Sequence, residues 1–364
     1  MRAMRILFIT RNFPPRRGGM ERVAYALYSQ LSRREEVILL KWAGPKKLLF
    51  LIIPYFFLRA SLILMSRNID IVYLNEGFLS LLGFGLKIFG RPVAVTIHGL
   101  DITYSNKIYQ FFIPRAVASL DKIICISHYT KKECLKRGIP EEKVVIIPDG
   151  CNDEFFRSER KVVFKKKLSG FVSEDLTKKK IILSVCRLIE RKGIHWFIEN
   201  VIPQIVSGKK DFLYIVIGDG PLRGRIERII HRINLSPWVK LLGSVKQEAL
   251  VVAYNAADIF VMPNIPVEGD AEGFGVVALE AASCGLPVLA SHLEGIPDAL
   301  LEGKLGVLIP SRDKNAWKDN VVSSLDNKDN FSEEIRNLAL QNFHWSKISH
   351  MYMLAFEAAL QSYR

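Results

Sequence analysis

Two carboxylates and two cations stand beside glycines in the second half of this 364-residue sequence. The carboxylates are Glu272 and Glu280, at the two ends of Glu-Gly-Phe-Gly-Val-Val-Ala-Leu-Glu; the cations are Arg187 and Lys192, which precedes Gly193. Carboxylates accept hydrogen bonds from hydroxyl groups, and cationic side chains bind phosphate. These residue types therefore indicate a ligand that carries both hydroxyls and phosphates, as a nucleotide sugar does.

The segment from Glu272 to Glu280 predicts a short helix that opens at its glycines. Gly273 and Gly275 would let backbone amides face a ligand, with Glu280 about two turns along the helix. The alanines and the leucine around Glu280 favour a packed helix, in which a carboxylate could accept both hydrogen bonds of a ribose diol. A solvated helix with an acidic residue at its positive N-terminal end would explain the same pattern without a ligand.

Arg187 and Lys192 flank the turn after a predicted strand. Two cations there could neutralise a departing diphosphate without a metal ion, although such residues are commonly solvated surface charges. The sequence contains no His-Glu-x-x-His and no Asp-x-Asp, and its seven histidines are dispersed. We therefore expect neither a metal ion nor any other cofactor.

Three further segments follow predicted strands. Gly18 and Gly19 open the first predicted helix, where free amides could bind a phosphate, and Gly220 stands in a similar turn later in the chain. The glycines could equally form tight turns without a ligand. His98, at the end of the fourth predicted strand, could contact a substrate hydroxyl or simply bond to the backbone of its own turn.

Composition places the chain among folded proteins with unpaired thiols. Hydrophobic residues make up 49% and charged residues 24%, so a disordered chain is excluded. The five cysteines are scattered and form no Cys-x-x-Cys pair, which indicates reduced thiols in the cytosol. The first ten residues are too short an apolar run for a signal peptide.

Positive charge is concentrated in the first part of the chain. Residues 1–150 carry 23 Lys and Arg against 11 Asp and Glu, whereas the remainder carries 28 against 26. This asymmetry predicts an anionic partner such as a lipid, a nucleic acid or a phosphorylated substrate, or else only a solvated basic surface. Because the sequence lacks the interleaved aromatic and basic residues of an RNA-binding sheet, we do not expect nucleic acid.

Residues 48–65 form a strongly apolar stretch about long enough to span a bilayer. Pro54 and Arg59 interrupt it, and a spanning helix would separate two strands of one predicted sheet. We therefore expect a buried or interfacial helix, with Lys46 and Lys47 near lipid headgroups. The protein would then be cytoplasmic and peripheral at the inner face of a membrane, touching its anionic lipids.

Strand and helix patterns alternate along the whole chain, which predicts α/β domains with doubly wound parallel sheets. We expect two Rossmann-like domains with a cleft between them, over residues 1–155 and 156–344, and a last helix near 345–364 that packs back on the first domain. The predicted strands cover residues 4–10, 36–41, 69–74, 93–98, 122–126, 144–147, 180–186, 212–217, 239–241, 258–262, 287–290 and 306–309. The predicted helices cover residues 21–31, 48–65, 78–89, 107–119, 129–137, 193–205, 222–233, 247–255, 275–283 and 314–325, with an entry helix within 157–180 and two more after residue 331.

Taken together, these segments resemble the retaining, metal-independent glycosyltransferases of the GT-B fold, group 1 or family 4. The resemblance spans nearly the whole chain and rests on Gly18-Gly19, His98-Gly99, Arg187 with Lys192-Gly193, Glu272 to Glu280, and Phe343-His-Trp345-Ser346. The sequence departs from the family at Pro148-Asp149-Gly150-Cys151-Asn152, where Asn-Gly-Val-Asp is usual.

The resemblance implies transfer of a hexose, with retention, from a UDP- or GDP-linked donor to an acceptor hydroxyl, for which we expect a lipid-linked or membrane-surface glycan. It assigns catalytic roles to His98, Arg187, Lys192 and Glu272. The implied donor-binding residues are Gly18, Gly19, Gly220, Ser244, Val245, Phe274, Gly275, Val276 and Glu280. Another GT-B enzyme, such as a sugar-nucleotide epimerase or a phosphorylase, and a non-catalytic membrane-binding protein remain alternatives.

Overall fold

The computed structural model describes residues 3–15, 18–42, 51–152, 154–208, 211–327 and 332–363. The chain divides into two compact units. The first comprises Met1–Gly150, Gly269–Phe274 and Phe343–Arg364, and the second comprises Cys151–Glu268 and Gly275–Asn342. The division at Gly150 falls close to the predicted boundary at residue 155. The short segment Gly269–Phe274, expected in the second domain, instead belongs to the first unit.

The first unit is built on a sheet of six parallel strands in the order β2-β1-β3-β4-β5-β6. Its strands are β-branched, mostly buried runs, as expected for a parallel sheet covered on both faces. Each lies at a position predicted from the sequence. The strands are β1 (Arg5–Thr10), β2 (Glu36–Lys41), β3 (Ile71–Leu74), β4 (Val93–Ile97), β5 (Lys122–Cys125) and β6 (Val144–Ile146).

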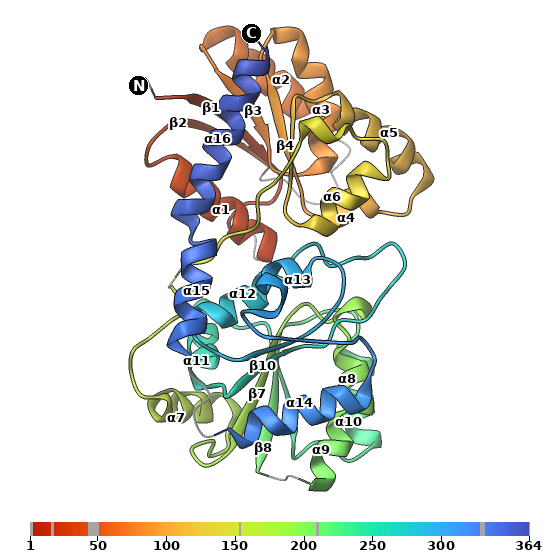
Figure 1. The fold of residues 1–364 in the computed structure, drawn as a ribbon, viewed down its shortest axis with the longest axis vertical. Coiled ribbons are helices and arrows are strands. Elements are labelled where there is room, and N and C mark those ends of the chain that lie inside the picture. The colour runs from red at the N-terminus through yellow and green to blue at the C-terminus, as the bar shows by residue number, and fades with distance from the viewer. Residues whose placement is uncertain are drawn as a thin grey trace. The chain divides into compact units, whose positions relative to one another are not determined.

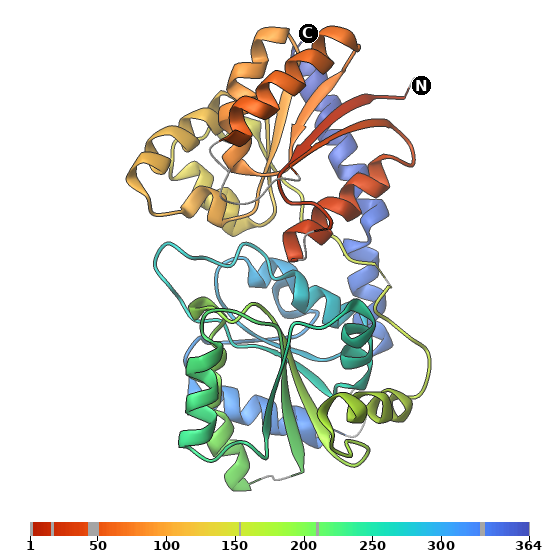
Figure 2. The ribbon, with the colours of Figure 1, turned by 180° about the vertical axis from the view of Figure 1, so that it is seen from behind.

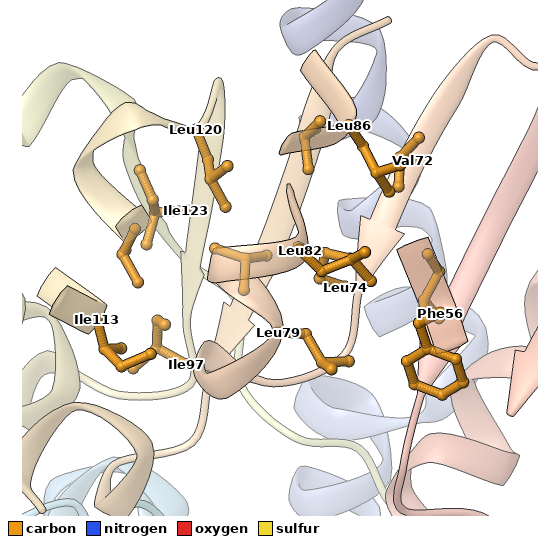
Figure 3. Packing of buried hydrophobic residues seen from close by; sticks show 14 of the residues in the cluster. Phe56, Val72, Leu74, Leu79, Leu82, Leu86, Ile97, Ile113, Leu120 and Ile123 are labelled. Carbon is orange, nitrogen blue, oxygen red and sulfur yellow. The ribbon is translucent and has the colours of Figure 1, made fainter. Parts of the chain in front are cut away.

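Helices cover both faces of this sheet, with α2 on the face opposite α16 (Figures 1 and 2). Right-handed crossovers place α2, α3 and α5 together, because their connections all run in one direction across the sheet. Their inner side chains, Phe56, Leu82, Leu86 and Ile113 among them, pack onto the strands (Figure 3). The helices are α1 (Gly19–Leu31), α2 (Ile52–Ser66), α3 (Ser80–Leu86), α4 (Leu100–Thr103), α5 (Lys107–Ser119), α6 (His128–Leu135) and α16 (Trp345–Tyr363).

Two predicted helices of the first unit differ from the observed ones. Helix α2 begins at Ile52, and Lys46, Lys47 and residues 48–50 lie outside the described residues. The helix expected over residues 78–89 is divided into α3 and short 3₁₀ turns at Gly77–Leu79 and Lys87–Phe89. Within the described ranges, no helix combines the length and apolar character needed to cross a membrane.

Helix α16 is part of the core of the first unit although it ends the chain. It contacts α1, β4 and β5. Tyr352 hydrogen-bonds to Thr96 at 3.2 Å and packs edge-on against Tyr73. A Cβ on Gly150 would lie 2.5 Å from the Trp345 ring, so the glycine lets the start of this helix pack closely.

The second unit has its own sheet of six parallel strands in the order β12-β11-β10-β7-β8-β9, and all six lie at predicted positions. This is the doubly wound Rossmann order. The strands are β7 (Lys180–Val185), β8 (Phe212–Ile217), β9 (Val239–Gly243), β10 (Ile259–Met262), β11 (Val288–Ser291) and β12 (Val307–Ile309). The helices are α7 (Lys161–Val172), α8 (Ile194–Asn200), α9 (Ile202–Gly208), α10 (Arg223–Arg232), α11 (Gln247–Ala256), α12 (Val276–Ser283), α13 (Ile296–Ala299), α14 (Lys314–Asp326) and α15 (Glu333–Phe343).

The single helix predicted over residues 193–205 is wrong, because the chain forms α8 and α9 with a break at Val201. Pro203 explains the break: it has no N–H to continue the ladder of α8, but it is tolerated in the first turn of a new helix. The short helices α4 and α13 were not predicted, since four residues are too few to show a periodic pattern.

Candidate functional site

The cations predicted to bind phosphate lie where the strand order of the second sheet reverses, between β7 and β10. Ligands of open α/β sheets bind beyond the carboxyl ends of the strands at such a point. Arg187 follows β7, and Lys192 ends the 3₁₀ turn Glu190–Lys192. Gly193 has a φ of 64°, and a Cβ there would overlap the carbonyl oxygen of Pro263. The loop after β7 is thus held tightly against the loop after β10.

The two cations differ in their exposure to solvent. Arg187 is exposed, and its side chain forms no ion pair with another described residue. Lys192 is only 9% exposed. The backbone N–H of Ile265 donates to the carbonyl oxygen of Arg191 at 2.9 Å. This hydrogen bond joins the loop after β7, which carries Lys192, to the loop after β10. A positive charge held in a rigid, partly dehydrated loop is suited to stabilise charge that develops on a phosphate.

The loops after β7, β8 and β9 are joined by backbone hydrogen bonds. Leu188 N donates to Asp219 O at 3.0 Å, and Gly218 N donates to Gly243 O at 2.8 Å. A Cβ on Gly220 would overlap the carbonyl oxygen of Leu188. Close packing between loops therefore accounts for Gly220 without a ligand, which was one of its two predicted interpretations.

Ser244 and Val245 follow β9 at the same edge of the sheet. Ser244 is exposed and Val245 is half-buried. Because β7, β8 and β9 are neighbours in the sheet, these residues share the carboxyl edge with Arg187 and Lys192.

Glu280 is buried inside the second unit, at 5% exposure on α12. The hydroxyl of Tyr254, on α11, donates to Glu280 Oε2 at 2.8 Å. The helix is packed, as the small residues around Glu280 predict, and Tyr254 supplies a hydrogen bond that the sequence did not indicate. Gly275 caps the start of α12 with a φ of 106°, and Val276 is its first residue.

The structure corrects the placement of Glu272. It does not lie on α12, which begins four residues later, but in the segment Gly269–Phe274 of the first unit. A Cβ on Gly273 would overlap the carbonyl oxygen of His98, and a Cβ on Gly99 would lie 2.9 Å from Gly273 Cα. Glycines on both sides therefore allow two backbones to meet. They bring the segments of Glu272 and His98, predicted independently, together within one unit.

His98 is oriented by its neighbours on the first sheet. Its Nε2 lies 2.9 Å from the carbonyl oxygen of Asn75, and because a carbonyl only accepts, Nε2 must carry the proton. In the neutral ring Nδ1 then has a lone pair; this atom is buried and has no hydrogen-bond partner among the described residues. Asp101 fixes the loop by accepting from His98 N at 2.9 Å and from Gly77 N at 2.8 Å.

A buried carboxylate that the sequence did not single out lies where the first sheet reverses its strand order, between β1 and β3. Glu76 is 1% exposed and accepts from Arg11 N at 3.0 Å, from the Arg11 guanidinium, and from Asn12 Nδ2 at 2.9 Å. Burial raises the pKa of Glu76, and the neighbouring Arg11 opposes that shift. Glu76 thereby ties the loop that leads to Gly18 and Gly19 to the end of β3.

The two glycines of that loop have different surroundings. Helix α1 begins at Gly19, and a Cβ added to Gly19 would meet no described atom within 4 Å. A Cβ on Gly18 would contact the Glu21 carboxylate. Internal packing therefore gives no reason for a glycine at position 19, which leaves room for a ligand at the start of α1.

Across the described residues, no group of three or more His, Cys, Asp or Glu side chains is arranged to hold a metal ion. A surface pocket of the second unit lies near the start of α7 and the end of α11, lined in part by Phe156, Asn255 and Leu286. None of the predicted site residues lines it, and we assign it no role.

Two family models match this chain, one over most of the first unit and one over most of the second. The model described as Glycosyltransferase Family 4 matches residues 17–155, and the model described as Glycosyl transferases group 1 matches residues 179–327. The chain is 24% identical, over 85% of its length and 86% of the other protein, to a GDP-mannose-dependent alpha-(1-6)-phosphatidylinositol monomannoside mannosyltransferase of Mycolicibacterium smegmatis. It is 26% identical to one subunit of the phosphatidylinositol N-acetylglucosaminyltransferase of Arabidopsis thaliana, over 82% of this chain and 64% of that protein.

Solved structures show the same architecture. Anabaena HepE, in complex with UDP and glucose, has a TM-score of 0.78 and 17% identity over 98% of this chain and all of that one. Sucrose-phosphate synthase from Thermosynechococcus elongatus has a TM-score of 0.79 and 20% identity over 99% of this chain and all of that one. The fold, the two matched models and the relatives agree: the chain belongs to the GT-B glycosyltransferases, with a family 4 region followed by a group 1 region.

Proposed function

We propose that this glycosyltransferase moves a hexose from a UDP- or GDP-linked donor to a hydroxyl of a lipid-linked or membrane-surface glycan, with retention and without a metal ion. The observation that carries the proposal is the pair Arg187 and Lys192 at the strand reversal of the second sheet. Two cations in one loop, one of them largely buried, can stabilise the diphosphate that leaves the sugar.

Donor binding is assigned mainly to the second unit. Glu280, which is buried and hydrogen-bonded to Tyr254, would accept hydrogen bonds from the two hydroxyls of a ribose. Ser244 and Val245 would lie near the base. Relatives support a nucleoside-diphosphate sugar, because one is named for GDP-mannose and a structural neighbour was solved with UDP and glucose.

The sugar itself is assigned to residues of the first unit. Glu272 would accept hydrogen bonds from the sugar hydroxyls, and the lone pair on His98 Nδ1 would accept one more. The Gly19 amide at the start of α1 would donate to the diphosphate, in the space left by the missing side chain. The remaining surface of the first unit would bind the acceptor.

Retention is proposed to follow a front-face route. The bond between the anomeric carbon and the diphosphate oxygen breaks, and a bond to the acceptor oxygen forms on the same face. The acceptor proton passes to an oxygen of the departing diphosphate, so no protein nucleophile takes part. Arg187 and Lys192 stabilise the negative charge that accumulates on the leaving group.

A lipid-linked acceptor is supported by two relatives whose names contain phosphatidylinositol and by the excess of positive charge in residues 1–150. Together they favour a peripheral enzyme at the cytoplasmic face of an anionic membrane.

The test is a donor screen that follows release of UDP or GDP, with lipid extracts as acceptors and with excess chelator. We expect one donor to be consumed, a glycosylated lipid to form with its anomeric configuration retained, and full activity in chelator. A strict requirement for a divalent ion, or an inverted product, would contradict the proposal. Conversion of the donor without transfer would indicate an epimerase instead, and sugar transfer to inorganic phosphate would indicate a phosphorylase.

A further inference from the structure

Large apolar side chains are exposed on one part of the first unit. In the described part of the chain, 21 large apolar side chains are exposed, and 14 of them lie between Leu51 and Phe112. This region contains three helices longer than one turn, α2, α3 and α5. Scattered exposed apolar residues are ordinary on soluble proteins, whereas a contiguous group marks an interaction surface.

The exposed residues form stripes along three neighbouring helices, α2, α3 and α5, in which α3 contacts both of the others. Apart from Phe57, they recur every three or four residues in each helix, so they share one side. We call this surface the apolar face; its residues are Leu51, Tyr55, Leu58, Leu62 and Met65 along α2, Leu81, Phe84 and Ile88 along α3 and the turn after it, and Ile108, Phe111 and Phe112 on α5.

The fold of the unit does not require this face to be apolar. The same helices already bury separate residues against the sheet, including Phe56 of α2, Leu82 of α3 and Ile113 of α5 (Figure 3). An ordinary surface helix places polar and charged residues on the side away from the core. Helices that are apolar on both sides need a second apolar environment for the outer one.

The charges on these helices indicate what that environment is. No Asp or Glu occurs in α2, α3 or α5, and the exposed charged residues are the cations Arg59, Lys107 and Arg115. The guanidinium of Arg115 lies 4.1 Å from the centre of the Phe111 ring, so charge and apolar surface are side by side. A surface that is apolar and cationic, with no carboxylate, complements an anionic lipid bilayer.

A second copy of this chain fits the face less well. If two copies met through this face, Arg59, Lys107 and Arg115 would face cations alone, since the three helices offer no carboxylate to pair with them. Leaving desolvated charges unpaired is costly. Phosphate groups of lipid supply the missing negative charge.

We propose that the apolar face of α2, α3 and α5 docks the first unit onto an anionic bilayer. The face extends toward His98: Leu100 and Tyr104, which follow His98 along the chain, are exposed as well, and the hydroxyl of Tyr109 on α5 donates to Asp101 O at 2.8 Å. Asp101 in turn holds His98 N. An acceptor anchored in the bilayer would thus reach the loop of His98 while its lipid chain stays in the membrane; this last step rests on the proposed function.

The docking test uses the full chain and needs no substrate. Co-sedimentation is measured with phosphatidylcholine vesicles that contain or lack phosphatidylglycerol, for the wild type and for the double variant Phe84→Glu/Ile108→Glu. The matched control is Phe171→Glu on α7 of the second unit, because Phe171 is 55% exposed and Phe84 is 63% exposed. Thermal unfolding checks that all variants fold.

We expect the wild type and Phe171→Glu to bind vesicles with phosphatidylglycerol. The double variant should bind at least a hundredfold more weakly, because each large apolar side chain withdrawn from the bilayer costs about tenfold or more. Replacing Arg59, Lys107 and Arg115 by Gln should weaken binding by roughly a hundredfold, at about fivefold for each basic residue near an anionic surface.

Three results would overturn the docking proposal: no binding of the wild type, equal binding of the double variant, or a wild-type dimer in solution that the double variant dissociates. Activity measurements test the proposed function separately from docking. The double variant should turn over donor normally with detergent-dispersed acceptor and lose turnover only with vesicle-embedded acceptor. If no form of the protein consumes any donor, the proposed function fails, while the sedimentation result still decides the docking.

Discussion

Replacing Lys192 by methionine removes one positive charge and keeps most of the side-chain volume. Because Lys192 is only 9% exposed, a phosphate bound beside it would be partly shielded from water. Two unit charges about 4 Å apart interact by about 4 kcal/mol at an effective dielectric constant of about 20. Loss of one such contact in a transition state typically costs roughly 10²–10³ in kcat. We therefore expect Lys192→Met to lower kcat by roughly 10²–10³.

Arg187 offers a comparison within the same loop. It is exposed, so water screens its charge, and the same 4 Å interaction falls to about 1 kcal/mol in water. Arg187→Met should therefore cost roughly fivefold to tenfold in kcat, clearly less than Lys192→Met. The matched control is Lys180→Met, which removes the same charge from the first residue of β7, at the opposite edge of the sheet.

The assay is release of UDP or GDP at saturating donor and acceptor, with thermal unfolding to show that each variant folds. Lys180→Met should retain wild-type kcat. The reasoning would be refuted by wild-type kcat in a folded Lys192→Met protein, or by an equal loss in Lys180→Met, since a distant charge cannot act on the leaving group directly.

Three further changes test other parts of the site. Gly273→Ala should lower the melting temperature and abolish transfer, because its Cβ would overlap the carbonyl oxygen of His98. Gly19→Ala, the control, should leave the melting temperature unchanged. Equal melting temperatures of the two variants would contradict this prediction. Tyr254→Phe should raise KM for the donor about tenfold or more, because it removes a hydrogen bond to the buried Glu280 carboxylate, usually worth about 1.5–3 kcal/mol. An unchanged KM would contradict a role of Glu280 in donor binding. Asp149→Asn should raise the free energy of unfolding at neutral pH. Burial raises the pKa of Asp149, and its Oδ1 has no hydrogen-bond partner among the described residues. Ionisation of this carboxyl group therefore destabilises the folded state. The advantage of Asn should shrink as the pH falls and Asp149 is protonated, which urea unfolding over a series of pH values would show.

The strands could be predicted from the sequence because each is a short, nearly continuous run of apolar residues. Such runs, as in β1 and β8, need no long-range information to be recognised. Helix ends follow less directly from the sequence: Pro203 divides one predicted helix, and a 3₁₀ turn precedes α3. Both depend on local backbone geometry that periodicity does not register.

Candidate site residues could be proposed from the sequence only where the type of the residue and the local structure around it both suggest a ligand. Arg187, Lys192 and Glu280 are of this kind, since each lies next to a strand end or in a packed helix, and their roles in binding and catalysis stay predictions. Glu76 is not, because its role comes from Arg11 and Asn12, which are distant in the sequence. The pattern Asn75-Glu76-Gly77 directly after β3 was the one local signal that could have drawn attention to it.

The Glu-Gly-Phe-Gly segment shows how a motif can combine packing and chemistry. Gly273 is explained by the carbonyl oxygen of His98, and Gly275 by its positive φ at the start of α12. Neither glycine needs a ligand. Burying the two carboxylates, Glu272 and Glu280, carries a desolvation cost, which the hydroxyl of Tyr254 partly offsets at Glu280. The glycines therefore place the carboxylates, one in each unit, and a substitution at a glycine should act by displacing them. That is why Gly273→Ala is expected to cost stability and transfer together, while Glu280→Gln should cost donor affinity at nearly constant stability.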